Sequence, residues 1–331
     1  MLLDDVRSLK ASMLEPMVAA AAAPSAVRGL GVRTQALGSE AEALRSIALG
    51  VSKSKKQHRL AVRVQRRALL HHPLLDRIQK QAKGEVDIRY VGRLSKLETA
   101  AALQRRRRPL AIGCSVGHFK ITAGTLGCFV KTRATQDVAI LSNNHVLANE
   151  NSAKTGDAIL QPGDLDGGAN PADIAATLSK FKRLSRTQPN LIDAAIAILS
   201  PGIPFNEKKL GSFGNLKGLG PDFLDDGAEV RKVGRTTGET KGRVTAFELD
   251  NVVVSYDIGN LRFDNQVEIE GGGAESFSDG GDSGRLIVNS DNLGVALLFA
   301  GGDSGGSNGM GLTYGNPLKT VLDGLKIDLF F

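Results

Sequence analysis

The 331-residue sequence has no tryptophan, only two cysteines and no long apolar run. These shortages limit the classes of protein to which the chain can belong. No stretch approaches the roughly 18 apolar residues that a membrane-spanning helix needs, so we expect no membrane partner. Cys114 and Cys128 are spaced as on the facing strands of a β-hairpin, which would allow a disulfide. Two cysteines in so long a chain are more often reduced thiols in the core, and the sequence leaves this choice open.

The first residues do not resemble a secretion signal. The sequence opens MLLDDVRSLK, with two acids where a signal peptide carries basic residues. No strong apolar segment precedes the run MVAAAAAPSA at 17–26. We therefore expect no signal peptide and a cytoplasmic location.

Negative charge is scarce in the first third of the chain. Residues 1–110 carry 22 Lys and Arg against 9 Asp and Glu, whereas residues 111–331 carry 20 against 26. This asymmetry fits either a nucleic-acid-binding arm or a basic unit that docks on an acidic one. Tyr90 is the only aromatic residue in the first 110, which argues against stacking on bases. We expect no nucleic-acid partner, although phosphate contacts stay open.

The first hundred residues predict a small α/β domain. Residues 1–50 are alanine-rich, with helical spacing and little indication of strands. The segment 57–65 alternates apolar and polar residues, 68–84 has helical spacing and ends on a glycine, and 85–94 alternates again. This order predicts a β-α-β unit.

A basic run, Arg105–Arg108, follows this unit. We interpret it as a solvated linker. The alternative is a processing site, but cleavage after Arg108 is disfavoured because Pro109 comes next.

From residue 110 onward the pattern is mostly β. Short apolar or alternating runs are separated by Gly, Asn and Asp, which is typical of a sandwich or barrel. One helix is expected at the end, over 316–325, beginning at Asn316 and Pro317.

The segment GGDSG at 280–284 is the clearest chemical motif. Acyl transfer needs a serine on a tight turn, with backbone N–H groups aimed at the developing oxyanion. Gly281 and Gly284 permit such a turn around Ser283. The N–H groups of Gly281 and Ser283 would then form the oxyanion hole.

A serine nucleophile needs a base, and the base needs an acid to orient it. Three of the five histidines lie in the basic first unit and His118 lies on an expected strand, whereas His145 ends the apolar run AILSNNHVL. Asp193 begins the apolar strand of NLIDAAIAIL, and Asp173 in ADIAATL is a rival with a similar local pattern.

These motifs resemble the bacterial branch of the chymotrypsin-like serine proteases. GTLGCFV, SNNHVL, the aspartate strand and GDSG follow in the family's order, and VGRTTGETKGRV at 233–244 is similar to its α-lytic-type branch. The resemblance covers about residues 110–331. It implies a mostly β fold, a chymotrypsin-like double six-stranded β-barrel with a C-terminal helix, here preceded by the small α/β domain.

The resemblance also implies a catalytic triad of His145, Asp193 and Ser283, with no cofactor and no metal. The gaps of 48 and 90 residues between them are close to the roughly 45 and 93 of the family template. Asp173 would give 28 and 110, so spacing favours Asp193.

The chain departs from the animal enzymes of this family. It lacks their Ile-Val-Gly-Gly activation start and their cysteine pattern, and it carries roughly 100 extra residues at the N-terminus. In the animal enzymes a new terminal ammonium pairs with the aspartate that precedes the nucleophile, here Asp282, which would be costly to bury unpaired. In the α-lytic-type branch a basic side chain takes that place, so we predict that Lys232, or failing that Arg235, pairs with Asp282.

The tetrapeptide GDSG occurs twice, since GGDSGG recurs at 301–306 with Ser304. The sequence after Ser283 supplies three expected strands and the final helix, enough to complete a barrel. After Ser304 only one strand and the helix remain, so we assign Ser304 to a loop beside the substrate wall.

The family's substrate pocket is built from the stretch before the nucleophile and from a strand after it. Here those positions are Phe277, Ser278, Phe299, Ala300 and Gly301. Since Phe277 stands where trypsin has its acid, we expect a small or apolar P1 residue rather than a basic one.

We therefore expect a serine endopeptidase that acts on protein or peptide substrates, divided into 1–108, a first barrel at 109–226 and a second at 227–331. One alternative is a catalytically silent, protease-like binding module, and another is a regulatory protease controlled by its N-terminal domain. That domain could be a prodomain, a lid or an oligomerisation module, and a homo-oligomer stays open. The natural substrate is not evident from the sequence.

Overall fold

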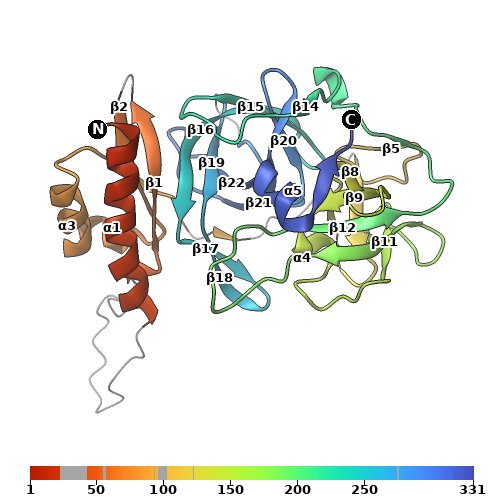
Figure 1. Cartoon of the computed structure of the whole chain (residues 1–331), viewed down its shortest axis with the longest axis horizontal. Helices are drawn as coiled ribbons and strands as arrows, with labels where there is room; N and C mark the ends of the chain where they lie inside the picture. The colour runs from red at the N-terminus through yellow and green to blue at the C-terminus, as the bar shows by residue number, and fades with distance from the viewer. Residues whose placement is uncertain (23–42, 55–56, 93, 96–102, 122, 274–275) are drawn as a thin grey trace, which may run out of the picture.

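The computed structural model describes the chain except for residues 23–42, 55–56, 93, 96–102, 122 and 274–275 (Figure 1). Strands dominate, as predicted, and form two large sheets and one two-stranded pair. No helix in the part of the chain described is long and apolar enough to cross a membrane.

The second half of the chain forms a closed barrel, because each of six strands pairs with two others around a ring. Five of these strands contribute side chains to one buried apolar core, among them Val230, Val244, Ile269, Ile287 and Leu298. The six strands are β15 (Glu229–Gly234), β16 (Gly238–Asp250), β19 (Gln266–Gly271), β20 (Leu286–Asn289), β21 (Leu293–Gly302) and β22 (Leu312–Pro317).

The other large sheet is curled, in the order β23-β8-β9-β12-β11-β10-β6-β7, and its two end strands are not paired with each other in the described residues. The predicted two-barrel fold is confirmed, with one barrel closed and one open. The strands of this sheet are β6 (Ser115–His118), β7 (Gly124–Thr125), β8 (Cys128–Thr132), β9 (Val138–Ser142), β10 (Ala158–Leu160), β11 (Ile174–Phe181), β12 (Ala195–Leu199) and β23 (Ile327–Leu329).

The predicted β-α-β unit is present near the N-terminus. The elements in this part of the chain are α1 (Leu3–Ala22), β1 (Ile47–Ser54), β2 (Gln57–Val64), η1 (Arg67–His71), α3 (Pro73–Gln81) and β3 (Val86–Tyr90). The parallel strands β2 and β3 are joined in sequence through the helix α3, and the longer helix α1 contacts β1 and β2 (Figure 1).

Strand β1 was not predicted, and its burial explains why. Leu49 and Val51 pack into one core while Ala48 packs into another, so the segment lacks apolar–polar alternation. β1 pairs with β2 on one side and with β16 on the other. The N-terminal sheet therefore continues the sheet of the closed barrel.

Ion pairs join the basic first unit to the acidic barrel. The Arg63 guanidinium is buried with its Nε 2.8 Å from Oε1 of the equally buried Glu268. Lys10 Nζ lies 3.0 Å from Asp250 Oδ2. These contacts favour docking as the explanation of the charge asymmetry. The predicted boundaries at 108 and 226 stay a prediction.

Shorter elements complete the fold around the site. A hairpin of two strands joins the closed barrel through the short β4, and the last helix begins at Leu318 rather than at 316, because β22 continues to Pro317. These elements are β4 (Leu94–Ser95), β5 (Leu110–Ala111), α4 (Asn144–Leu147), η2 (Asp164–Asp166), β13 (Phe205–Asn206), η3 (Gly211–Phe213), β14 (Gly218–Leu219), β17 (Val252–Tyr256), β18 (Gly259–Phe263) and α5 (Leu318–Leu325).

Candidate active site

His145 and Asp193 are brought together by two paired strands. His145 lies in α4, just after β9, and Asp193 lies just before β12. The two strands are antiparallel, with Ser142 opposite Ala195, so the end of one meets the start of the other. His145 Nδ1 lies 2.5 Å from Asp193 Oδ2.

The Asp193 carboxylate is completely buried and fully supplied with donors. Oδ1 accepts the backbone N–H of Asn144 at 2.6 Å and that of His145 at 3.3 Å. Oδ2 accepts the Tyr256 hydroxyl at 2.7 Å in addition to the imidazole. Burial raises the pKa of Tyr256 well above its ordinary value, and the charge of Asp193 raises it further, so the phenol remains a donor.

Two asparagines fix the backbone of Asp193. Its N–H donates to Asn316 Oδ1 at 3.0 Å, and its carbonyl accepts from Asn143 Nδ2 at 2.7 Å. Asn316 was predicted to start the last helix. Instead it sits at the end of β22 and ties the acid of the first sheet to the closed barrel.

The turn that carries Ser283 depends on glycine. Gly281 and Gly284 have φ of 82° and 90°, in the left-handed region. A Cβ on Gly284 would lie 2.0 Å from Ser142 Oγ and 2.6 Å from the Thr125 carbonyl oxygen. The serine turn therefore packs directly on the end of the strand that leads to His145.

The atoms that a triad would join are buried without partners. Ser283 Oγ and His145 Nε2 are both inaccessible, and neither forms a hydrogen bond with any residue described. Buried polar atoms normally have a partner. Ten without one occur among the residues described, and these two are the pair that a Ser–His hydrogen bond would join. Unbound enzymes often hold such groups apart until substrate binds.

Two backbone N–H groups beside Ser283 are also without an acceptor. Neither Gly281 nor Ser283 donates its N–H to another described residue. The Gly280 carbonyl accepts the Thr236 hydroxyl at 2.6 Å. Because a trans peptide points its C=O and N–H in opposite directions, this bond turns the Gly281 N–H away from Thr236. The arrangement suits an oxyanion hole.

Asp282, the residue before the serine, is buried among cations and hydroxyls. Lys232 Nζ lies 2.7 Å from its Oδ2 and Arg285 Nη2 lies 3.2 Å from its Oδ1. The Thr237 hydroxyl donates to Oδ2 at 2.8 Å. Lys232 thus stands where the sequence predicts it, whereas Arg285 was missed. Arg235 lies elsewhere, since it pairs with Asp166.

Burial sets the protonation of this cluster. Burial lowers the pKa of Lys232 to about 8, although Asp282 opposes the shift, and it lowers that of Arg285 to about 10. Burial alone would raise the pKa of Asp282, but Arg285 and Lys232 hold it below its ordinary value. The carboxylate therefore stays charged at neutral pH.

The predicted substrate residues divide into two groups. Ser278 is half-buried, and its Oγ lies 2.5 Å from Thr313 Oγ1 at the edge of the barrel. Phe277 corrects the prediction, because its ring is buried in the core of the closed barrel beneath Lys232. Phe299 is likewise buried, with its ring centroid 4.6 Å from that of Phe263.

A segment of the N-terminal unit covers the strand on which the other predicted substrate residues lie. Ser95 pairs with Gly301 in antiparallel fashion, so β4 lies along the end of β21. Val91 and Leu94 are buried in the same apolar cluster as Phe299 and Ala300.

The second GDSG copy contacts this covering segment. A Cβ on Gly92 would lie 2.2 Å from Ser304 Oγ, and one on Gly305 would lie 2.7 Å from the Tyr90 carbonyl oxygen. Ser304 is therefore placed in a loop against the N-terminal unit.

The rival residues make other pairs. Asp173 accepts from Arg106 Nε at 2.8 Å, which also ties the basic linker to the first sheet. His118 Nε2 lies 3.0 Å from Asp157 Oδ2, a His–Asp pair on the same sheet.

The two cysteines are free and buried. Burial raises the pKa of Cys114 to about 11 and that of Cys128 to about 12, which keeps both thiols protonated. No group of three or more His, Cys, Asp or Glu suited to a metal ion occurs among the residues described.

No family model matches the sequence, and no curated protein matches it. Solved structures of bacterial chymotrypsin-like serine proteases are similar to it at low identity. Thermobifida fusca protease A is 15% identical with a TM-score of 0.45, over 66% of this chain and 98% of that chain. Cellulomonas bogoriensis chymotrypsin is 18% identical with a TM-score of 0.44, over 68% and 99%. Nocardiopsis protease is 16% identical with a TM-score of 0.45, over 68% and 100%.

Proposed function

We propose that this chain is a serine endopeptidase that hydrolyses protein or peptide substrates through an acyl-enzyme. The observation that carries the proposal is the buried His145–Asp193 pair, with the glycine turn of Ser283 packed on the strand that delivers the histidine. A protein that only binds peptides would have no need for an orphaned serine hydroxyl and an orphaned imidazole nitrogen at the same site.

Each group has a role in this scheme. Ser283 Oγ attacks the scissile carbonyl while His145 Nε2 takes its proton, and the histidine then gives that proton to the leaving amine. Asp193 holds the imidazole and stabilises its protonated form. The N–H groups of Gly281 and Ser283 bind the oxyanion, and water attacks the acyl-enzyme in the second half of the reaction.

No cleavage would be needed to complete this site. Asp282 already has two buried cations, Lys232 and Arg285, so a new terminal ammonium is not required to neutralise it. The serine turn can therefore take its working conformation as soon as the chain folds.

The proposal is tested by incubating the protein with a mixture-based peptide library and sequencing the products. We expect new termini that depend on Ser283, with a small or apolar residue before the cleaved bond, and no products from Ser283→Ala. Equal cleavage by wild type and Ser283→Ala would contradict the proposal. If neither protein cleaves the library, even when the segment that covers the site is loosened, the catalytically silent binding module is favoured.

A specific observation favours the second candidate, a protease regulated by its N-terminal unit. An extended substrate needs a free strand edge beside the catalytic serine, and pairing to such an edge is a common way to bind peptides. Here the segment that includes Leu94 and Ser95 already occupies the edge at Gly301. Ser283 itself is only 2% exposed.

This regulation is tested at Leu94, whose side chain is 2% exposed. We expect Leu94→Ser to loosen the covering segment and raise peptide hydrolysis severalfold, because a buried leucine contributes about 2–5 kcal/mol to its packing. Leu94→Val keeps an apolar anchor and serves as the control. Unchanged or lower activity in Leu94→Ser, with an intact circular dichroism spectrum, would contradict regulation by this segment.

A further inference from the structure

We propose that a basic cavity between the N-terminal unit and the β17–β18 hairpin binds a small anion with several phosphate groups. The cavity has a volume of about 910 Å³, within the range of roughly 300–1,000 Å³ that small-molecule sites occupy. It is separate from the candidate active site, since neither the serine turn nor His145 lines it. The inference does not depend on protease activity.

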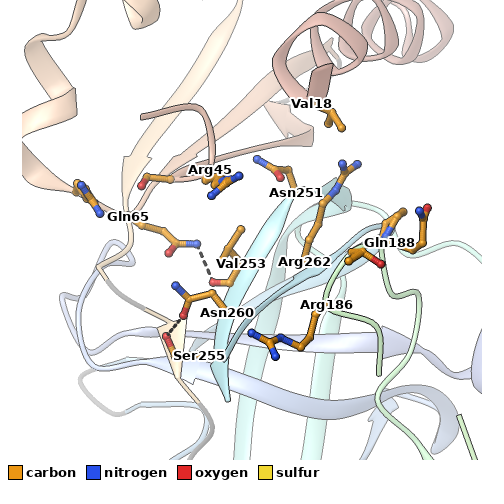
Figure 2. Close-up of a pocket in the computed structure, with 14 residues that line it drawn as sticks. Val18, Arg45, Gln65, Arg186, Gln188, Asn251, Val253, Ser255, Asn260 and Arg262 are labelled. Carbon is orange, nitrogen blue, oxygen red and sulfur yellow. Dashed lines mark hydrogen bonds between the residues drawn. The ribbon is translucent and has the colours of Figure 1, made fainter. Parts of the chain in front are cut away.

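Four arginines line this cavity, each from a different segment. Arg45 precedes β1, Arg66 follows β2, Arg186 lies in the loop before β12, and Arg262 lies on β18. Figure 2 shows Arg45, Arg186 and Arg262 around one space with Asn251 and Val253. No aspartate or glutamate is found among the described residues that line it.

Arg262 is held in a fixed orientation. Its Nε donates to Asp264 Oδ1 at 2.8 Å and its Nη2 donates to Oδ2 at 2.6 Å. Asp264 Oδ1 also accepts the Asn251 N–H at 2.8 Å. A guanidinium fixed through one edge is pre-organised, so less conformational entropy is lost when its other edge binds an anion.

Arg186 supplies the least constrained guanidinium of the site. It is exposed and forms no ion pair or hydrogen bond with the other described residues. Its Nε lies 3.7 Å from the position that a Cβ on Gly259 would take, so it rests over the hairpin turn.

The wall between the two units is already joined by a polar contact. Gln65 Nε2, from the N-terminal unit, donates to the Val253 carbonyl at 3.1 Å (Figure 2). Gln188 and Asn260 add amide side chains to the lining, with Asn260 on the same hairpin as Val253. A ligand held by arginines from both sides would add to this contact and stabilise the docked arrangement.

The residue types favour phosphate over other anions. Guanidinium groups match phosphate oxygens with paired hydrogen bonds, and several of them together balance a multiply charged ligand. No aromatic side chain is present among the described lining residues, so the cavity offers no stacking surface for a nucleobase. The ligand class that fits is therefore an inorganic or organic polyphosphate bound through its phosphates.

The test measures binding of inorganic tripolyphosphate to the full chain by titration calorimetry, with citrate as a polycarboxylate anion for comparison. We expect tripolyphosphate to bind more tightly than citrate and to raise the melting temperature. Arg186→Gln and Arg262→Gln should each weaken binding about tenfold, the loss of roughly one charge-assisted hydrogen bond. Arg183→Gln is the control, since Arg183 is exposed in the same loop and does not line the cavity.

Three results would overturn the proposal. These are no tripolyphosphate binding at low salt, equal binding of citrate, and equal weakening by Arg183→Gln. Tighter binding of a single-stranded oligonucleotide would assign the surface to nucleic acid instead. Arg186→Gln keeps the test decisive if Arg262→Gln fails to fold, because Arg186 forms no ion pair or hydrogen bond with the other described residues.

Discussion

The two halves of the candidate site are organised in opposite ways. On the curled sheet, Asp193 is saturated with hydrogen bonds to Asn144, His145 and Tyr256. On the closed barrel, the atoms around Ser283 that would contact substrate have no partners, while Asp282 behind them is held by two cations.

This difference matches what the proposed reaction would require of each half. In the proposed reaction Asp193 and His145 would have to keep one geometry throughout, which fits contacts that are complete without substrate. A serine nucleophile and its oxyanion donors would have to keep their bonding capacity for the substrate, which fits polar atoms left without partners in front of a turn that is held through Asp282. The backbone is therefore held in both halves, by hydrogen bonds at Asp193 in one and by the ion pairs of Asp282 in the other.

The largest expected effect comes from the saturated half. Asp193→Asn should slow fluorophosphonate labelling of Ser283 by about 10⁴-fold, because an amide favours the wrong imidazole tautomer. Asp173→Asn is the control and should change the rate little, since Asp173 pairs with Arg106. A loss of less than tenfold in Asp193→Asn would mean that the pair does not serve the serine.

On the other half, Lys232→Met should be the most damaging change that leaves Ser283 itself in place. It leaves Asp282 buried with one cation fewer, which we expect to lower the free energy of unfolding by about 3 kcal/mol. Displacement of the serine turn should slow labelling on the order of 10²-fold. Both are measured on one preparation, by urea unfolding and labelling rate, and full activity with unchanged stability would contradict the role given to Lys232.

Tyr256→Phe tests the donor that sequence did not predict. Loss of one hydrogen bond to a buried carboxylate should slow labelling by roughly tenfold. Tyr314→Phe is matched to it, because Tyr314 also donates to a buried carboxylate, that of Glu268, away from the site. Equal losses of activity in both variants would mean that the Tyr256 hydroxyl supports the fold and has no specific role at the site.

The smallest effect is a pH dependence that separates activity from stability. The folded pKa of Lys232 is about 8, below its ordinary 10.5, so the buried amine loses its proton as pH rises through 8. Labelling should fall severalfold there. Between about pH 8 and 10.5 the Lys232 amine is neutral in the folded chain but still protonated in the unfolded chain. Because the unfolded state binds more protons in this range, Lys232 makes the free energy of unfolding rise with pH.

Lys232→Arg provides the control for this pH dependence. A guanidinium keeps its charge, so labelling by this variant should stay level between pH 8 and 10. The same fall in both proteins would assign the pH dependence to another group.

Much of the fold was predictable because its patterns are local. Alternation predicted β2 and β3, and helical spacing predicted the helix between them. β1 was missed because it is buried on both faces and shows no alternation. Its pairing with β16, which joins the N-terminal sheet to the barrel, links segments about 200 residues apart and leaves no local pattern.

The site was predictable where motif and spacing coincide. His145, Asp193 and Lys232 were proposed from their sequence context, and the structure gives each of them the expected neighbour. Tyr256 and Arg285 were missed because their partners are set by packing and not by a motif. Phe277 was wrongly assigned because position in a motif does not say which way a side chain turns.

The central claim is that Ser283 is the nucleophile, and locating a covalent adduct tests it most directly. The full chain is treated with a fluorophosphonate, digested and analysed by mass spectrometry, with Leu94→Ser treated in parallel so that a covered site can react. The account predicts an adduct on Ser283 alone, abolished by Ser283→Ala and retained in Ser304→Ala. An adduct on Ser304, or none in either protein, would contradict it.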